Sequence, residues 1–213
     1  MAVAGKVSVR PSGAAGTAQV SPAGVILAAG ASSRMGRPKA LLQYQGETFL
    51  DRWIRLFSNV CQPVIVVLGY DADRIRLGVQ RSADAIFVLN PEPSRGMLSS
   101  LQTAMRSVPA AAERVVFTLV DHPQVSSATI AAVAEARALV AIPVFGGERG
   151  HPVSIARSVM EEILQLPPES SPQDVMRRHR NETLFLEVGD PGVLADVDDP
   201  AAYAALSPQK LQQ

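Results

Sequence analysis

The sequence has little cysteine, no excess of either charge and no long apolar run. Its single cysteine, Cys61, excludes an internal disulfide framework and a cysteine-based zinc cluster. Lys and Arg together number 20, as do Asp and Glu, so general binding to nucleic acid is poorly supported. No stretch approaches the ~18 apolar residues that a membrane helix needs, and the N-terminal residues lack the apolar core of a secretory signal. We therefore expect a cytoplasmic protein that binds neither nucleic acid nor membranes.

The length of 213 residues and the apolar content of 47% indicate one globular domain with a buried core. Residues 1–22 are small and polar, and we expect them to form a disordered tail. The domain is predicted to span 23–207, and 208–213 to form a short C-terminal tail.

Short apolar runs alternate with amphipathic stretches from residue 23 onward. Runs of this kind are typical of parallel strands covered on both faces, and the intervening stretches have helical spacing. The alternation predicts a mostly parallel, Rossmann-like α/β sheet, with ligands beyond the carboxyl ends of its strands. Strands are expected at 25–28, 64–68, 85–89, 115–120, 141–144, 152–156 and 183–188, and helices near 50–57, 71–79, 97–108, 126–139, 158–166, 173–180 and from 200 onward.

The most informative segment is 25–39, which reads VILAAGASSRMGRPK. A buried strand is predicted to end in a loop where Gly30 permits close approach of the backbone to a ligand. Ser32 can donate a hydroxyl hydrogen bond, and Arg34 and Lys39 are cations suited to phosphate oxygens. The spacing matches neither the P-loop nor the GxGxxG fingerprint, which disfavours P-loop hydrolases and dinucleotide oxidoreductases. We interpret the segment as a phosphate-binding loop rather than a solvated loop with incidental cations.

Asp121 follows another predicted strand and is a candidate ligand for Mg²⁺, which commonly takes one or two carboxylates together with substrate phosphates. Alone, it is explained equally well as a turn or capping residue, but beside a phosphate loop the metal role is favoured. Asp196 and Asp198 alternate along an extended segment, so either could complete the metal shell. Asp199 is expected to cap a helix that begins at Pro200.

The segment 146–152, GGERGHP, holds three glycines in five residues after a predicted strand. Arg149 and His151 in this loop can meet an anion, which favours a role in recognising an acceptor. The alternative is a plain hairpin turn with a solvated Arg149.

The segment 90–101 is a loop that enters a helix. Gly96 and Ser100 lie near the predicted N-terminus of that helix, where backbone donors favour an anion or a nucleobase carbonyl. Gly69 follows a further strand at the same edge of the sheet.

Five motifs, in this order along the chain, resemble those of the MobA-like nucleotidyltransferase family: LAAGxSxRMGxPKxLL, N…RGMxSSLxxA, VDHPxV, GxRGHPV and DVDDPxxY. The match covers residues 24–206, and it is most like the branch that contains the molybdenum cofactor cytidylyltransferases. Five motifs in the family order are far more specific than any single one.

The resemblance implies a three-layer α/β fold of the GT-A type, in which the 27–30 turn binds the base and Arg34 and Lys39 hold the triphosphate. It also implies that Asp121 binds Mg²⁺ with Asp198 as the second ligand. The expected positions are catalytic Arg34, Lys39 and Asp121; nucleotide-binding Leu27, Ala28, Ala29, Gly30, Ser32, Gly69, Gly96 and Ser100; metal-binding Asp121 and Asp198; and acceptor-binding Gly147, Arg149, Gly150 and His151.

The implied reaction transfers a nucleoside monophosphate from an NTP and releases pyrophosphate. CTP is the expected donor, because Ala-Ala-Gly at 28–30 resembles the cytidylyl-transferring branch whereas the guanylyl-transferring branch typically has Ala-Gly-Gly. Molybdopterin, or the molybdenum cofactor, is the expected acceptor; its phosphate monoester is already an anion near neutral pH, so no general base is needed. A molybdoenzyme or its accessory protein is a candidate partner. Two alternatives stay open: a nucleotidyltransferase for a sugar phosphate or another small phosphorylated alcohol, and a non-catalytic protein that binds or delivers the molybdenum cofactor.

Overall fold

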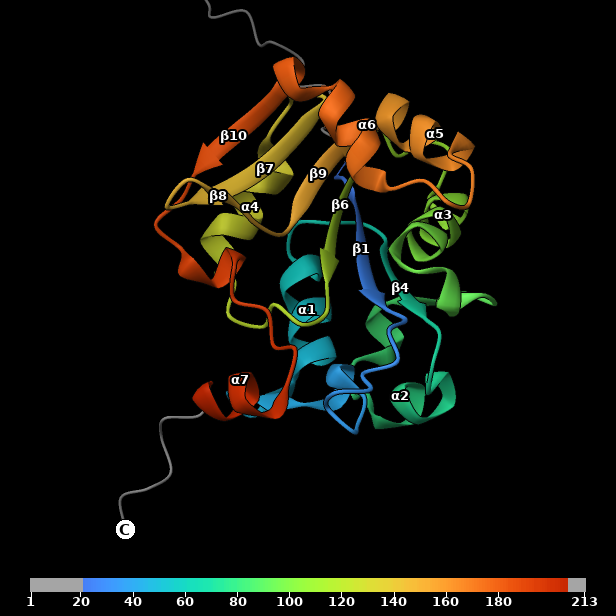
Figure 1. The fold of residues 1–213 in the computed structure, drawn as a ribbon, viewed down its shortest axis with the longest axis vertical. Coiled ribbons are helices and arrows are strands. Elements are labelled where there is room, and N and C mark those ends of the chain that lie inside the picture. The colour runs from blue at the N-terminus through green and yellow to red at the C-terminus, as the bar shows by residue number, and fades with distance from the viewer. Residues whose placement is uncertain (1–20, 207–213) are drawn as a thin grey trace, which may run out of the picture.

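The computed structural model describes residues 21–206. Its strands are β1 (Ala23–Ala28), β2 (Gln43–Tyr44), β3 (Glu47–Thr48), β4 (Val64–Leu68), β5 (Ile86–Leu89), β6 (Arg114–Leu119), β7 (Val140–Phe145), β8 (Glu148–Arg149), β9 (Val153–Ala156) and β10 (Thr183–Glu187). The central sheet has the order β10-β7-β9-β6-β1-β4-β5, and β8 pairs with β7 (Figure 1). Within it β1, β4, β5 and β6 run parallel, whereas β9 is antiparallel to both β6 and β7. The predicted mostly parallel α/β sheet is confirmed.

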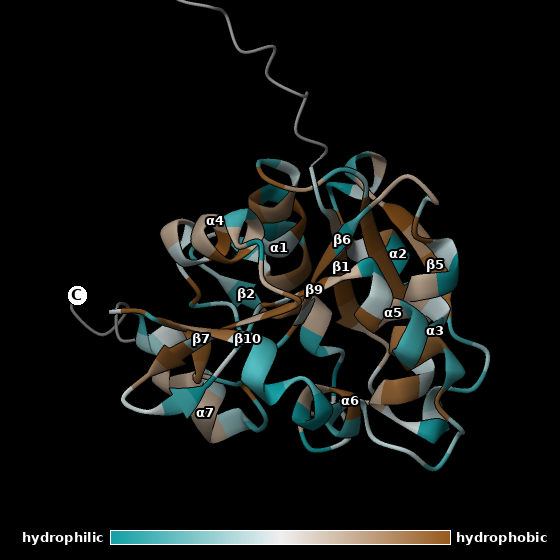
Figure 2. Cartoon of the chain, turned by 90° about the horizontal axis from the view of Figure 1, so that it is seen from above, coloured by the Kyte–Doolittle hydropathy of each residue, from teal (hydrophilic) through white to brown (hydrophobic). Residues whose placement is uncertain are grey.

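Helices cover both faces of this sheet and give the three layers. They are α1 (Phe49–Ser58), α2 (Ala72–Gly78), α3 (Met97–Ser107), α4 (Ser127–Glu135), α5 (Arg157–Gln165), α6 (Pro172–Arg178) and α7 (Pro200–Ala205). One core cluster joins the sheet to α1, α2 and α4, and the other joins it to α3, α5 and α6. Figure 2 shows α1 and α4 on one side of the sheet and α6 on the other.

The inner strands are buried on both faces because helices cover each of them. Ile26 and Val66 point into the cluster with α1, whereas Val25 and Ile65 point into the cluster with α3. This two-residue period is the geometry of a strand, and it explains why the run in β1 is apolar throughout.

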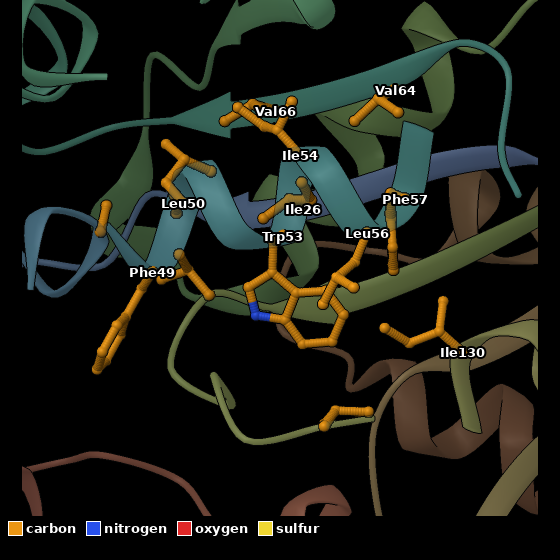
Figure 3. Close-up of a cluster of buried hydrophobic side chains, with 14 of the residues drawn as sticks. Ile26, Phe49, Leu50, Trp53, Ile54, Leu56, Phe57, Val64, Val66 and Ile130 are labelled. Atoms are coloured by element: carbon orange, nitrogen blue, oxygen red, sulfur yellow. The ribbon is translucent and has the colours of Figure 1, made fainter. Parts of the chain in front are cut away.

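The helix predicted near 50–57 is α1, and its apolar residues lie in the core. Trp53 and Phe57 lie one turn apart in the core, with ring centroids 5.2 Å apart in an edge arrangement (Figure 3). Thr48 caps the helix, since its hydroxyl oxygen accepts from the backbone N–H of Asp51. The Asp51 carboxylate is buried and accepts hydrogen bonds from the Thr48 hydroxyl and from the backbone N–H groups of Gln80 and Arg81.

The structure corrects one helix and adds one hairpin. The helix predicted for 126–139 ends at Glu135, because Leu139 lies at the edge of β7 and its carbonyl accepts from the backbone N–H of Ala156. The β2–β3 hairpin, whose turn has positive φ at Gln45 and Gly46, was not predicted.

The predicted tails 1–22 and 208–213 lie outside the described residues except for Ser21 and Pro22, and they stay predictions. Pro22 already belongs to the fold, because its carbonyl accepts from the backbone N–H of Gln62. Within residues 21–206, every helix is too short or too polar to cross a membrane.

The Asp51 carboxylate ties α1 to the loop at residues 80–81, so its removal should destabilise the fold. We predict that Asp51→Ala lowers the free energy of unfolding by about 2–3 kcal/mol, because it leaves partly buried backbone donors without an acceptor. Urea unfolding at pH 7 measures this. The exposed Asp73, in the first turn of α2, is the matched control, and Asp73→Ala should change stability by less than about 0.5 kcal/mol. Equal losses in the two variants would contradict the assignment.

Candidate active site

The loops after β1, β5 and β6 meet at one edge of the sheet, toward which the arrowheads of β1 and β6 both point in Figure 1. They surround a pocket of about 290 Å³. All the predicted nucleotide-binding residues except Gly69 line it. The lining consists of Leu27, Ala28, Ala29, Gly30, Ser32, Lys39, Ala40, Ile75, Pro93, Gly96, Met97, Ser100, Leu119, Val120 and Asp121.

Gly69 has a steric role beside the pocket. A Cβ at this position would lie 2.7 Å from the carbonyl oxygen of Ala29 and 2.7 Å from Cβ of Pro93. Glycine therefore lets the loop after β4 pack against two segments that line the pocket.

One end of the pocket is charged. The Lys39 ammonium donates to Oδ2 of Asp121 at 2.8 Å and to Oδ1 of Asp198 at 2.5 Å. Arg34, which is largely exposed, donates to the other oxygen of Asp198 at 2.6 Å. The backbone N–H of Lys39 donates to the Ser32 hydroxyl, so the loop holds its own cation in place. The three predicted catalytic residues and Asp198 thus form one cluster of two cations and two carboxylates.

The cluster perturbs its own ionisation. Burial alone would lower the pKa of Lys39, but its bonds to Asp121 and Asp198 outweigh this and leave that pKa above its usual value. The hydrogen bond from Lys39, with a smaller contribution from Arg34, lowers the pKa of Asp198. Both shifts keep Lys39 and Asp198 charged near neutral pH.

The carboxylates suit a hard cation such as Mg²⁺. Oδ1 of Asp121 is buried and has no hydrogen-bond partner within residues 21–206. The same part of the chain holds no group of three or more His, Cys, Asp or Glu that could bind a metal, so an ion here would rely on Asp121, Asp198, phosphate and water. That is the usual manner of Mg²⁺ binding, and the two carboxylates lie close enough to share one cationic group, since both bond to the Lys39 ammonium.

Of the two alternatives left open by the sequence, Asp198 joins the cluster and Asp196 does not. Asp196 is exposed, and its side chain has no hydrogen bond or ion pair with the described residues. The segment is held in place by the backbone N–H of Val197, which donates to the carbonyl of Asp121 at 2.9 Å. Asp199 caps α7 as predicted.

The predicted acceptor loop divides into a hairpin and a packed segment. Gly147 lies at the turn between β7 and β8 with φ +86°, and Arg149 stacks over the ring of Phe185, 5.0 Å from its centroid. Gly150 packs on the backbone of Val193 so tightly that a Cβ would lie 2.3 Å from that carbonyl oxygen. The turn matches the hairpin alternative, although Arg149 has an aromatic partner.

His151 is the acceptor-loop residue that reaches the neighbourhood of Asp121. Its ring centroid lies 5.1 Å from that of His122, which directly follows Asp121. The Nδ1 atoms of both rings are buried without hydrogen-bond partners among the described residues. Burial lowers the pKa of His122 and lowers that of His151 to about 4, so both rings are neutral at pH 7.

Sequence reasoning gave no role to His122 or Asn90, although both occupy strand-end loops. Asn90 directly follows β5 and was visible as a polar residue at the predicted strand end. Among the lining residues, Leu119 and Val120 were also missed, and their signal was the same as that of Leu27 and Ala28: an apolar strand end before a polar loop.

Comparison with known proteins identifies the family of this chain. The family model of the MobA-like NTP transferase domain matches residues 24–183. A molybdenum cofactor cytidylyltransferase from Escherichia coli (strain K12) is 25% identical over 177 residues, which cover 83% of this chain and 90% of that protein. A probable molybdenum cofactor guanylyltransferase from Rhodopirellula baltica is 40% identical over 107 residues, 48% of this chain and 49% of that one.

Two solved structures share the fold. The crystal structure of Rv0371c from Mycobacterium tuberculosis H37Rv is 29% identical and aligns with a TM-score of 0.75, covering 88% of this chain and 97% of that chain. A structure of Rv0371c in complex with manganese aligns with a TM-score of 0.72 at 27% identity, covering 88% of this chain and 98% of that chain.

A mostly parallel α/β sheet with a cationic loop and paired carboxylates beyond its strand ends suits a nucleotidyltransferase, which is the class that the family match shows. The chain belongs to the MobA-like NTP transferase domain family, whose model matches well over half of its length.

The depressed pKa of His151 makes stability depend on pH. The unfolded state binds a proton below about pH 6.5, whereas the folded state resists protonation down to about pH 4, so stability falls as pH drops through this window. We predict that His151→Asn reduces the loss of unfolding free energy between pH 7 and pH 5 by an amount on the order of 1 kcal/mol. Urea unfolding at the two pH values measures it.

His179 offers a control of opposite sign. Glu182 and Glu162 raise the pKa of His179, so its contribution is present at low pH and is lost as pH rises. His179→Asn should therefore make the loss at low pH larger. The same pH dependence in wild type and His151→Asn would contradict the role of His151.

Proposed function

We propose that the protein is a Mg²⁺-dependent nucleotidyltransferase that moves CMP from CTP onto the phosphate of molybdopterin and releases pyrophosphate. The observation that carries this proposal is a cluster of two cations and two carboxylates, of which Lys39 and Asp121 line a pocket whose other lining residues are uncharged. A nucleoside triphosphate has the same division, since its base is neutral and its phosphates are anionic.

The uneven distribution of charge in the pocket sets the orientation of the nucleoside triphosphate. The base and ribose would lie among Ala29, Gly96 and Met97, and the phosphates would lie against Lys39 and Arg34. Bound Mg²⁺ would neutralise charge on the phosphates while Asp121 and Asp198 hold it. Lys39 would then exchange its carboxylate partners for phosphate oxygens and stabilise the departing pyrophosphate.

The acceptor would approach from the side of His122 and His151. Both rings are neutral at pH 7 and neither contacts the pocket. A phosphate monoester is already ionised, so the reaction needs alignment of its oxygen with the α-phosphorus rather than a general base.

Two observations support the choice of substrates. The E. coli and R. baltica relatives are both named for the molybdenum cofactor, which supports molybdopterin as the acceptor. The names differ in the nucleotide that is transferred, which is cytidylyl for the E. coli protein and guanylyl for the R. baltica protein. The choice of CTP therefore rests on Ala28-Ala29-Gly30 and on the longer match to the E. coli protein.

Pyrophosphate release tests the proposal directly. Purified protein is incubated with molybdopterin or with a panel of sugar phosphates, together with CTP, GTP or ATP, and with Mg²⁺ or EDTA. We expect release with CTP that exceeds release with GTP and ATP, and none with EDTA. Release with sugar phosphates instead would redirect the acceptor, and binding of molybdopterin without consumption of any NTP would overturn the enzymatic proposal.

Substitution of Lys39 gives the most direct test of the proposed mechanism. We predict that Lys39→Ala lowers turnover by about 10²–10³-fold, as expected for the loss of one preorganised electrostatic donor. Arg37 is the matched control, because it lies in the same loop but stacks over Tyr203, 5.2 Å from the ring centroid, outside the pocket. Arg37→Ala should change turnover by less than about threefold. Wild-type turnover in Lys39→Ala would remove Lys39 from the mechanism.

A further inference from the structure

The uncharged end of the pocket contains one buried hydroxyl. Among the lining residues, the polar side chains of Ser32, Lys39 and Asp121 lie at the charged end, where they are joined by hydrogen bonds. Ser100 on α3 also lines the pocket, but its side chain bonds to Asn90 rather than to this group, and it is 5% exposed. It is thus placed to meet the neutral part of a bound nucleotide.

Asn90 lies behind Ser100 and is 2% exposed. The backbone N–H of Glu92 donates to Oδ1 of Asn90 at 2.9 Å. A backbone N–H can only donate, so this bond fixes which end of the Asn90 amide is the oxygen. The amide nitrogen must therefore face α3, where it donates to the hydroxyl oxygens of Ser99 at 2.9 Å and Ser100 at 3.0 Å.

Ser99 and Ser100 differ in whether the protein offers an acceptor for the hydroxyl hydrogen. The Ser99 hydroxyl lies 2.9 Å from the carbonyl oxygen of Gly96 and 3.1 Å from that of Glu92, so its proton has an acceptor within the protein. No acceptor among residues 21–206 takes the proton of Ser100. Because Asn90 engages a lone pair of Ser100, the O–H of Ser100 is left to point into the pocket.

We propose that Asn90 is a positioning residue that fixes the Ser100 hydroxyl as a hydrogen-bond donor to an acceptor atom of the nucleobase. This inference rests on the proposed function, in which the pocket holds a nucleoside triphosphate. Asn90 does not line the pocket and acts through Ser100. Cytosine, the expected base, presents O2 and N3 as adjacent acceptors.

Asn90→Asp tests the direction of this hydrogen bond. A carboxylate at position 90 keeps the hydrogen bond from the backbone of Glu92, but it can only accept. It would therefore accept a hydrogen bond from the Ser100 hydroxyl, which would leave a lone pair of that hydroxyl facing the base. We expect the affinity for CTP, measured by calorimetry, to fall by about tenfold or more. KM should rise while kcat stays within about threefold, because the interaction is made equally in the ground and transition states. Inorganic triphosphate, which probes the charged end alone, should bind within about twofold of wild type.

Ser100→Ala and Ser99→Ala form the matched pair. Ser100→Ala should weaken CTP binding by about tenfold and leave inorganic triphosphate unaffected. Ser99→Ala loses a bond to the same Asn90 but lies outside the pocket, so it should bind CTP like wild type. This pair decides the question if Asn90→Asp fails to fold.

Several results would overturn the inference: wild-type affinity for CTP in Ser100→Ala, equal losses in both serine variants, or a parallel loss of triphosphate binding. Failure of the proposed function is distinguishable, because wild-type protein would then bind none of CTP, GTP and ATP.

Discussion

The site depends on the contact of the Lys39 ammonium with Asp121 and Asp198. These carboxylates lie 82 and 159 residues further along the chain, yet one side chain joins them. The contact brings together the loop after β1, the loop after β6 and the segment before α7. In that partly buried position, Asp121 without the Lys39 cation would be an uncompensated charge, whereas Asp198 would keep only its ion pair with Arg34. The cationic loop and the acidic residues are therefore one structural unit.

The register of the parallel strands makes that contact possible. β1 lies between β4 and β6, with Ala28 opposite Leu68 and Leu27 opposite Leu119. The strands consequently end at the same level, and the chain that leaves each of them starts at the same edge. Residues distant in the sequence meet there without any long loop, because the sheet has already aligned their starting points. The pocket is a consequence of this register rather than of any one loop.

Features with local causes were predictable from the sequence, and features with distant causes were not. Both β1 and α1 were predicted, because the apolar run of β1 and the helical spacing of apolar residues in α1 follow directly from which side chains are buried. The end of α4 depends on a bond between Leu139 and Ala156, a partner brought near only by the sheet. The same holds for the insertion of antiparallel β9 between β6 and β7, and for the contact of Asn90 with Ser100. The pocket lining followed from strand-end loops, whereas the orientation of its hydroxyl required the folded chain.

The charge balance of the cluster bears on how a nucleotide enters. Arg34, Lys39, Asp121 and Asp198 contribute two positive and two negative charges, which neutralise one another. A triphosphate entering alone would meet carboxylates already paired with the cations it needs, and it would be repelled by them. A triphosphate accompanied by Mg²⁺ resolves this conflict, since the metal offers the carboxylates a replacement for Lys39 and Arg34. Under the proposed function, the internal ion pairs therefore favour a nucleotide that carries its own cation over free nucleotide or free metal.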